Sequence, residues 1–99
     1  MKRTLVRYRT KPDQADTNQR LIEAVFRELK AKRPSGVRYM VLRLPDGTFM
    51  HFVTSEDGAM SLPSLAAFQA FQAGIKDRCL EPPQPTEPTL VGSYGFAPD

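Results

Sequence analysis

Two alternating runs of β-forming residues, joined by a three-residue turn signal, constrain this chain more than any other feature of its sequence. Val37–Leu44 and Thr48–Thr54 predict two strands, and Pro45-Asp46-Gly47 lies between them. Proline fixes φ at the second turn position, aspartate tolerates the third, and glycine takes the left-handed conformation. We therefore predict a hairpin in which the first residue after the loop faces the last residue before it.

This register sorts the hairpin side chains into two sets, one for each face of the sheet. One set is fully apolar, and we expect it to lie beneath helices: Met40, Leu42, Leu44, Met50 and Phe52. The other set combines aromatic and valine side chains with a histidine and an arginine: Tyr39, Val41, Arg43, Phe49, His51 and Val53. A sheet with helices on one face only would expose this second set, so we expect a partner or a ligand to cover it.

A strand and a long amphipathic helix are predicted before the hairpin. Residues Thr4–Arg9 alternate and favour a strand. The helix runs to Lys32, with Asp13 as the expected N-cap and Pro34-Ser35-Gly36 as the signal that ends it. Its apolar side chains recur three and four residues apart and form one stripe: Leu21, Ile22, Val25, Phe26 and Leu29.

A second helix and a last strand are predicted after the hairpin. Ser61 or Leu62 is expected to cap this helix, with Pro63 in its first turn, and the helix kinks or ends at Gly74. Glu81–Pro88 contains four prolines, so we expect an extended connector there and not a strand. Thr89–Phe96 is expected to form the last strand.

The complete order of elements is therefore β-α-β-β-α-β. It predicts one α+β domain over residues 1–99 with the ferredoxin-like topology, in which an antiparallel sheet carries both helices on one face. No apolar run approaches the roughly 20 residues of a membrane-spanning helix, so we expect no membrane association. The chain has one cysteine, Cys79, and its first residues do not resemble a signal peptide, which predicts a cytoplasmic location.

Positive charge is concentrated in the first part of the chain. Residues 1–43 hold twelve Lys and Arg and four Asp and Glu, a net +8, whereas residues 44–99 hold two basic and seven acidic residues, a net −5. A basic half can attract an anionic partner such as nucleic acid. Alternatively, the two halves offset each other within one fold or across a subunit contact.

Three short segments resemble one known family. They are Tyr8-Arg9-Thr10-Lys11-Pro12-Asp13 before the long helix, Arg33-Pro34-Ser35-Gly36-Val37-Arg38-Tyr39 before the second strand, and Ala67-Phe68-Gln69-Ala70-Phe71 in the second helix. These segments resemble the antibiotic-biosynthesis-monooxygenase-like proteins of the dimeric α+β barrel superfamily. The resemblance implies a homodimer that pairs its sheet faces into a barrel with room for a small organic molecule.

The same resemblance implies several activities. Some members are cofactor-independent oxygenases of polyketide-like quinols, others degrade haem, and many have no known activity. This chain has no Trp, which the haem-degrading members use beside Asn and His, and neither Asn18 nor His51 maps onto that set. We therefore predict a small-molecule-binding barrel protein without a cofactor, whose expected activity, if it is an enzyme, is cofactor-independent monooxygenation.

His51 is the candidate catalytic residue, because its unperturbed pKa lies near neutrality. The predicted ligand-binding residues are Tyr39, His51, Arg7 and Phe49. The alternative for His51 is a packed histidine in a subunit contact. The sequence also leaves open which side of the first strand, that of Arg7 or that of Tyr8, lines the barrel. With one histidine and no carboxylate in register, no metal site is predicted.

Two other functions remain open at this point. Gly47-Thr48-Phe49-Met50-His51-Phe52-Val53 resembles the strand-three motif of RNA-recognition motifs, which would make the chain a nucleic-acid-binding module. Three features argue against nucleic acid: the first strand lacks the partner motif, the first helix is long, and the connector before the last strand is rich in proline. A structural or regulatory dimer without catalysis is the third possibility.

Overall fold

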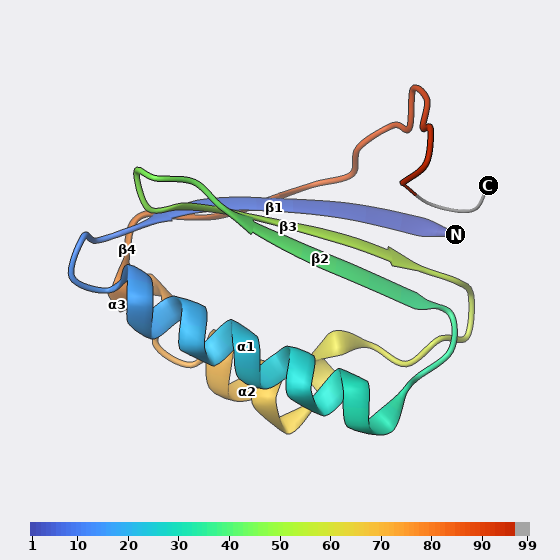
Figure 1. The fold of residues 1–99 in the computed structure, drawn as a ribbon, viewed down its shortest axis with the longest axis horizontal. Coiled ribbons are helices and arrows are strands. Elements are labelled where there is room, and N and C mark those ends of the chain that lie inside the picture. Colours follow the sequence, from blue (N-terminus) through green and yellow to red (C-terminus); the bar gives the residue numbers. More distant parts are fainter. Residues whose placement is uncertain (97–99) are drawn as a thin grey trace.

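The computed structural model describes residues 1–96 as one sheet and one helical layer (Figure 1). Residues 97–99, the end of the predicted domain, lie outside the described residues. The strands are β1 (Lys2–Thr10), β2 (Val37–Arg43), β3 (Thr48–Ser55) and β4 (Cys79–Thr86). The helices are α1 (Ala15–Lys32), a single 3₁₀ turn η1 (Leu62–Ser64), α2 (Ala66–Gln72) and α3 (Ile75–Arg78).

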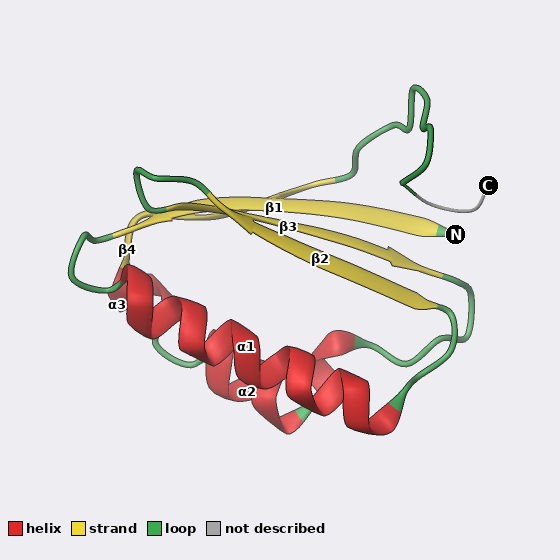
Figure 2. Ribbon diagram, in the orientation of Figure 1, coloured by secondary structure: helices red, strands yellow, loops and turns green. Residues whose placement is uncertain are grey.

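The sheet has the strand order β2-β3-β1-β4, and each neighbouring pair is antiparallel. The helices cover one face of the sheet, and the other face carries no helix (Figure 2). Helix α1 connects β1 to β2 across the intervening β3, and it packs beside α2. The predicted α+β class, with the ferredoxin-like order and helices on one face, is confirmed.

The predicted hairpin register is confirmed. Val41 pairs with His51, and the Leu44 N–H donates to the Thr48 carbonyl at 2.8 Å. Gly47 has a φ of +87°, which only glycine adopts without strain. The side chain of Asp46 closes the loop by accepting the Thr48 N–H at 2.9 Å. The turn residues therefore fix which side chains share a face, as the sequence indicated.

The prediction of which face lies beneath the helices is wrong. Phe49 and His51 are 1% and 4% exposed and lie under the helical layer, whereas Met40 and Leu42 are 45% and 47% exposed on the open face. Both sets are largely apolar, so the alternation of side chains assigns each residue to a set but does not say which set is buried. The rings from the helices decide the orientation, because they pack against the aromatic set of the sheet; Phe26, for example, stacks on Tyr39 at 4.9 Å.

The prediction of the last strand is also wrong. The proline-rich segment, expected to be a connector, forms β4, and Thr89–Phe96 contains no strand. β4 is an edge strand that pairs with β1 alone, so a proline can occupy it without removing a hydrogen bond to a second neighbour. Irregularities in this pairing between Arg7 and Thr10 accommodate the proline-rich backbone.

The helix ends differ from the sequence prediction at two positions. Ser61 or Leu62 was expected to cap the second helix, but only the 3₁₀ turn η1 forms there, and α2 begins at Ala66. Helix α1 begins at Ala15 after Gln14, without a side-chain cap, so the prediction of Asp13 as N-cap is wrong. The backbone N–H of Gln14 bonds instead to the carbonyl of Lys11 at 2.9 Å, which closes a turn before the helix. At Gly74, with a φ of +75°, the second helical segment breaks as expected, and α3 follows as a separate turn.

Candidate functional site

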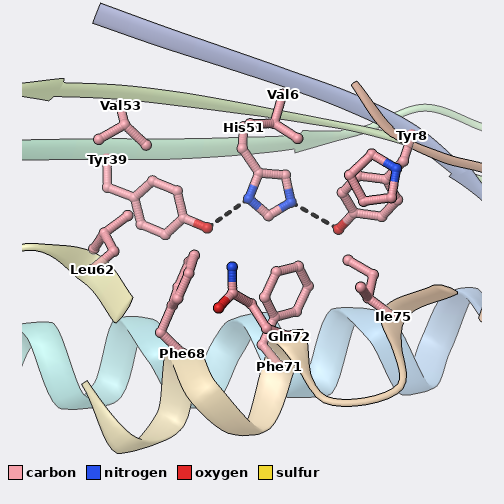
Figure 3. Close-up of a pocket in the computed structure, with 11 residues that line it drawn as sticks. Val6, Tyr8, Tyr39, His51, Val53, Leu62, Phe68, Phe71, Gln72 and Ile75 are labelled. Carbon is pink, nitrogen blue, oxygen red and sulfur yellow. Dashed lines mark hydrogen bonds between the residues drawn. The ribbon is translucent and has the colours of Figure 1, made fainter. Parts of the chain in front are cut away.

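A cavity of about 240 Å³ lies between the sheet and the helical layer. Its walls are mostly apolar, from both layers: Val6, Val53, Leu62, Phe68, Phe71 and Ile75. Tyr8, Tyr39, His51 and Gln72 bring polar atoms to it, and Figure 3 shows the histidine ring between the two tyrosines. The site is therefore an apolar chamber with one polar cluster on its sheet side.

His51 is the centre of this polar cluster. The hydroxyl oxygen of Tyr8 lies 2.8 Å from Nε2 of His51, and that of Tyr39 lies 2.6 Å from Nδ1 (Figure 3). Burial lowers the pKa of His51 to about 4, and burial raises the pKa of both tyrosines above the ordinary value. All three side chains are therefore neutral at pH 7.

Two further polar side chains support Tyr8 from behind. The amide nitrogen of Asn18 donates to the Tyr8 hydroxyl at 2.8 Å, and Nε of Arg78 donates to the Asn18 carbonyl oxygen at 3.1 Å. Arg78 also donates to the carbonyl of Ala73 at 3.0 Å and to that of Phe71. Asn18 and Arg78 are 0% and 7% exposed, so this network satisfies polar groups that water cannot reach.

Among the residues that the structure describes, no carboxylate pairs with the buried cation of Arg78. Within residues 1–96, the ion pairs involve other side chains, and Arg78 is held by neutral oxygens and by the face of the Phe71 ring, 5.6 Å from its centroid. Burial lowers the pKa of its guanidinium, but an arginine keeps its charge at pH 7. The network thus has a positive charge at one end.

Aromatic rings hold the cluster in place. Tyr8 stacks on Phe49 with 5.6 Å between ring centroids, and the His51 ring lies 5.3 Å from that of Phe71. Phe68 contacts Tyr39 edge to face at 6.5 Å. Such pairs restrict the ring rotations that would break the short hydrogen bonds of the cluster.

The structure brings together only part of the predicted ligand-binding set. Tyr39 and His51 lie at the cavity. Phe49 does not line the cavity. Its ring is buried in the core, with 1% exposed, and stacks on the ring of Tyr8. Arg7 lies on the open face, where its guanidinium is 4.0 Å from Glu81. Neither Arg7 nor Phe49 therefore lines this cavity, and their predicted roles in ligand binding stay predictions.

The side of β1 that the sequence left open is now fixed. Val6 and Tyr8 point into the cavity, and Arg7 points away from it. Asn18 was not predicted as a site residue, although it lies four residues before Ile22 on the apolar stripe of α1. A polar residue within such a stripe is a signal for a buried hydrogen bond. No sequence pattern marked Arg78 as a site residue, because only the tertiary fold brings it next to Asn18.

Within the described part of the chain, no group of three or more metal-ligating His, Cys, Asp or Glu side chains is found. None of the helices there has the length and hydropathy to cross a membrane. The cysteine is buried and free, and burial raises the pKa of its thiol.

No family model matches the chain, and no curated protein matches it in sequence. Solved structures do match it. A "putative antibiotic biosynthesis monooxygenase" from Nitrosomonas europaea has a TM-score of 0.73 at 15% identity, over 93% of this chain and 100% of that chain. One of the same name from Caulobacter crescentus CB15 has a TM-score of 0.71 at 15% identity, over 91% and 89% of the two chains.

A third match is Rv0793 from Mycobacterium tuberculosis, with a TM-score of 0.70 at 15% identity over 94% of this chain and 97% of that one. The fold is that of antibiotic biosynthesis monooxygenase-like proteins. This confirms, at the level of the fold, the resemblance seen in the three short segments. Identities this low carry no residue roles, so the chemistry of the site has to be argued from its own side chains.

Proposed function

We propose that this chain binds a small organic molecule in the cavity between the sheet and the helices. The observation that carries the proposal is the cavity itself, with apolar walls and a polar cluster of three neutral rings on one side. Pockets that bind drug-sized ligands usually have volumes of about 300–1,000 Å³, so about 240 Å³ suits a compact ligand of one or two rings.

A substitution that fills the cavity with a larger side chain tests this proposal. Gln72 lines the cavity but is exposed, so we expect Gln72→Trp to fold normally and to fill the ligand space. Ala70→Trp is the matched control, because residue 70 is exposed on the same helix and does not line the cavity. Binding of 2-naphthol is followed by amide chemical shifts in two-dimensional NMR. We expect binding by the wild type and the control and a loss of at least tenfold in affinity for Gln72→Trp; equal affinities would contradict the proposal.

Cofactor-independent monooxygenation is the reaction we propose for this site. The names of two of the matching proteins support it, as does a cavity whose polar groups include two tyrosines and a histidine. In such a reaction one atom of O₂ enters the ligand and the other leaves as water, and the ligand itself supplies both hydrogens of that water and the four electrons that reduce O₂. The test is oxygen uptake by the purified protein, free of metal and flavin, with a polyketide-like quinol and with Gln72→Trp as the control. Binding of the quinol without oxygen uptake would contradict the reaction and leave the binding function intact.

We also propose that two copies of the chain associate through the open face of the sheet. The surface differs from the one that the sequence suggested, since the chain's own helices cover Tyr39 and Phe49. The open face is apolar as well: Met40 pairs with Phe52, Leu42 pairs with Met50, and the two β2 residues are nearly half exposed. Apolar side chains side by side on an uncovered sheet are typical of an interface.

The segment after β4 supports a second copy as the occupant of this face. Residues 87–96 turn away from the helical layer and leave the body of the fold (Figure 1). Four apolar side chains of this segment are exposed by half or more: Leu90, Val91, Tyr94 and Phe96. The same chain thus carries an apolar segment, residues 87–96, and an apolar sheet face that its own fold leaves uncovered. If two copies exchanged these segments, each segment would cover the sheet face of the other copy.

The solution mass tests the dimer. We expect the wild type at micromolar concentration to show about twice 11.1 kDa in light scattering, and Leu42→Glu to show 11.1 kDa. Ala70→Glu adds the same charge on the exposed side of α2 and should stay dimeric. A wild-type monomer at this concentration would contradict the proposal.

Nucleic-acid binding is not proposed. It depended on Tyr39 and Phe49 lying on an open sheet face, where bases could stack on them, and both rings lie beneath the helices. The cytoplasmic location expected from the single cysteine stays a prediction.

A further inference from the structure

The polar cluster and the residues behind it form one continuous chain of hydrogen bonds. It begins at the guanidinium of Arg78, passes through Asn18, Tyr8 and His51, and ends at Tyr39 beside the cavity. The first two bonds have a fixed direction. Arginine can only donate, so the carbonyl oxygen of Asn18 faces Arg78, and its NH₂ group therefore donates to the Tyr8 hydroxyl.

The direction of the next two hydrogen bonds follows from the donors and acceptors that remain on each group. Neutral His51 has one N–H donor and one acceptor nitrogen, so one tyrosine donates to it and the other accepts from it. If Nε2 carried the proton, the Tyr8 oxygen would accept twice, and its own hydrogen would have no acceptor. Tyr8 is 1% exposed, and a buried donor without a partner costs about 1–3 kcal/mol.

The opposite arrangement satisfies the buried hydroxyl of Tyr8 both as donor and as acceptor. Tyr8 accepts from Asn18 and donates to Nε2 of His51, and Nδ1–H of His51 donates to the Tyr39 oxygen. The hydroxyl hydrogen of Tyr39 is then not used in the bond to His51. Tyr39 is only partly buried and lines the cavity, so this hydrogen can meet a ligand there.

From this we infer that the Arg78–Asn18–Tyr8–His51 chain fixes His51 as the Nδ1–H tautomer and makes Tyr39 a hydrogen-bond donor to the ligand. The inference rests on the proposed binding function of the cavity and names its ligand class: molecules that present a carbonyl or phenolate oxygen to Tyr39. Each donor polarises the next, and the positive charge of Arg78 lies at the start of this series of hydrogen bonds, so Tyr39 favours a ligand oxygen that carries negative charge. Asn18 and Arg78 are positioning residues.

The tautomer can be measured without any ligand. His51 is the only histidine of the chain, so a two-bond ¹H–¹⁵N spectrum of the untagged protein contains one imidazole. Nε2 is recognised by its coupling to both carbon-bound ring protons. We expect Nε2 to be the unprotonated nitrogen at pH 7. An Nε2–H tautomer would overturn the inference whatever the cavity binds.

The substitution Asn18→Asp is expected to reverse the direction of the hydrogen bonds from Tyr8 to Tyr39. The carboxylate accepts from Arg78 and from the Tyr8 hydroxyl, so Tyr8 can then only accept from His51, and the tautomer becomes Nε2–H. Tyr39 must now donate to Nδ1, so its hydroxyl hydrogen is no longer available for a hydrogen bond to the ligand. Gln19→Glu is the matched control, because it makes the same change one residue along on the exposed side of α1. A wild-type tautomer in Asn18→Asp would contradict the assigned direction.

The ligand class is tested with 4-nitrophenol, whose absorption reports its ionisation. We expect the wild type and Gln19→Glu to bind it as the phenolate and to lower its pKa, and Asn18→Asp to bind it at least tenfold more weakly. Binding of the neutral phenol with an unchanged pKa would overturn the ligand part of the inference. The Nδ1–H tautomer together with no binding of 4-nitrophenol or 2-naphthol would instead contradict the proposed function of the cavity, and the acceptor preference with it.

Discussion

The buried imidazole of His51 should make the stability of this protein depend on pH. Burial lowers the pKa of His51 from 6.5 to about 4 in the folded chain. In the unfolded chain the ring is in water and titrates near 6.5. Between these two values the unfolded state binds a proton that the folded state does not, so the free energy of unfolding falls as the pH falls from 6.5 to 4.

The magnitude follows from the difference between the two pKa values. One pKa unit corresponds to about 1.4 kcal/mol, so the difference of roughly 2.5 units corresponds to a loss of about 3 kcal/mol. Above pH 6.5 the full stability is present, and below pH 4 this group causes no further loss. For a domain of this size, 3 kcal/mol is a large part of the total stability of about 5–15 kcal/mol.

Urea unfolding at pH 7.0 and 4.5, for the wild type and His51→Gln, isolates this contribution. Carboxylates titrate in both proteins, so their effect cancels in the comparison, and glutamine has no proton to gain. We expect the wild type to lose about 2–3 kcal/mol more than His51→Gln over this interval. Equal losses in the two proteins, or an NMR titration of the single histidine with a midpoint near 6.5, would refute the reasoning.

Two further predictions concern packing. Gly47→Val should lower the free energy of unfolding by about 1–3 kcal/mol, because its φ is +87° and a Cβ there would lie 3.2 Å from the Thr10 backbone oxygen. Gly58→Val has a similar φ of +81° but nothing within 4 Å, so it should cost less, and equal losses by urea denaturation would contradict the role of the close contact. Phe71→Ala should cost about 3–5 kcal/mol, since the ring is 4% exposed and packs on both Tyr8 and His51. A loss below 1 kcal/mol in thermal unfolding would contradict this account of the core.

Much of the fold could be predicted from local sequence. The Pro45-Asp46-Gly47 turn fixed the pairing of Val41 with His51, because loop length sets hairpin register. The stripe of α1 appeared in the spacing of its apolar residues. The proline-rich β4 could not be predicted in this way, because a proline is tolerated in a strand only at an edge, and edges are a property of the whole sheet.

The candidate site was predicted only in part. His51 and Tyr39 were named because histidine and tyrosine can donate and accept hydrogen bonds and the hairpin register places both on the same face of the sheet. Asn18 and Arg78 lie sixty positions apart in the chain, and their hydrogen bond exists only because α3 packs against α1. No local pattern encodes such a contact.

The amino-acid sequence by itself determined the order of the elements, the hairpin register and the two sets of side chains that alternate along it. Tertiary structure alone decided which set is buried and whether Arg7 or Tyr8 faces the cavity. The physical reason is that alternation divides the residues of a strand between two faces, and it does not say which face is buried when both sets are largely apolar. Only the aromatic rings of the helical layer, packed onto Tyr39 and His51, distinguish one half from the other.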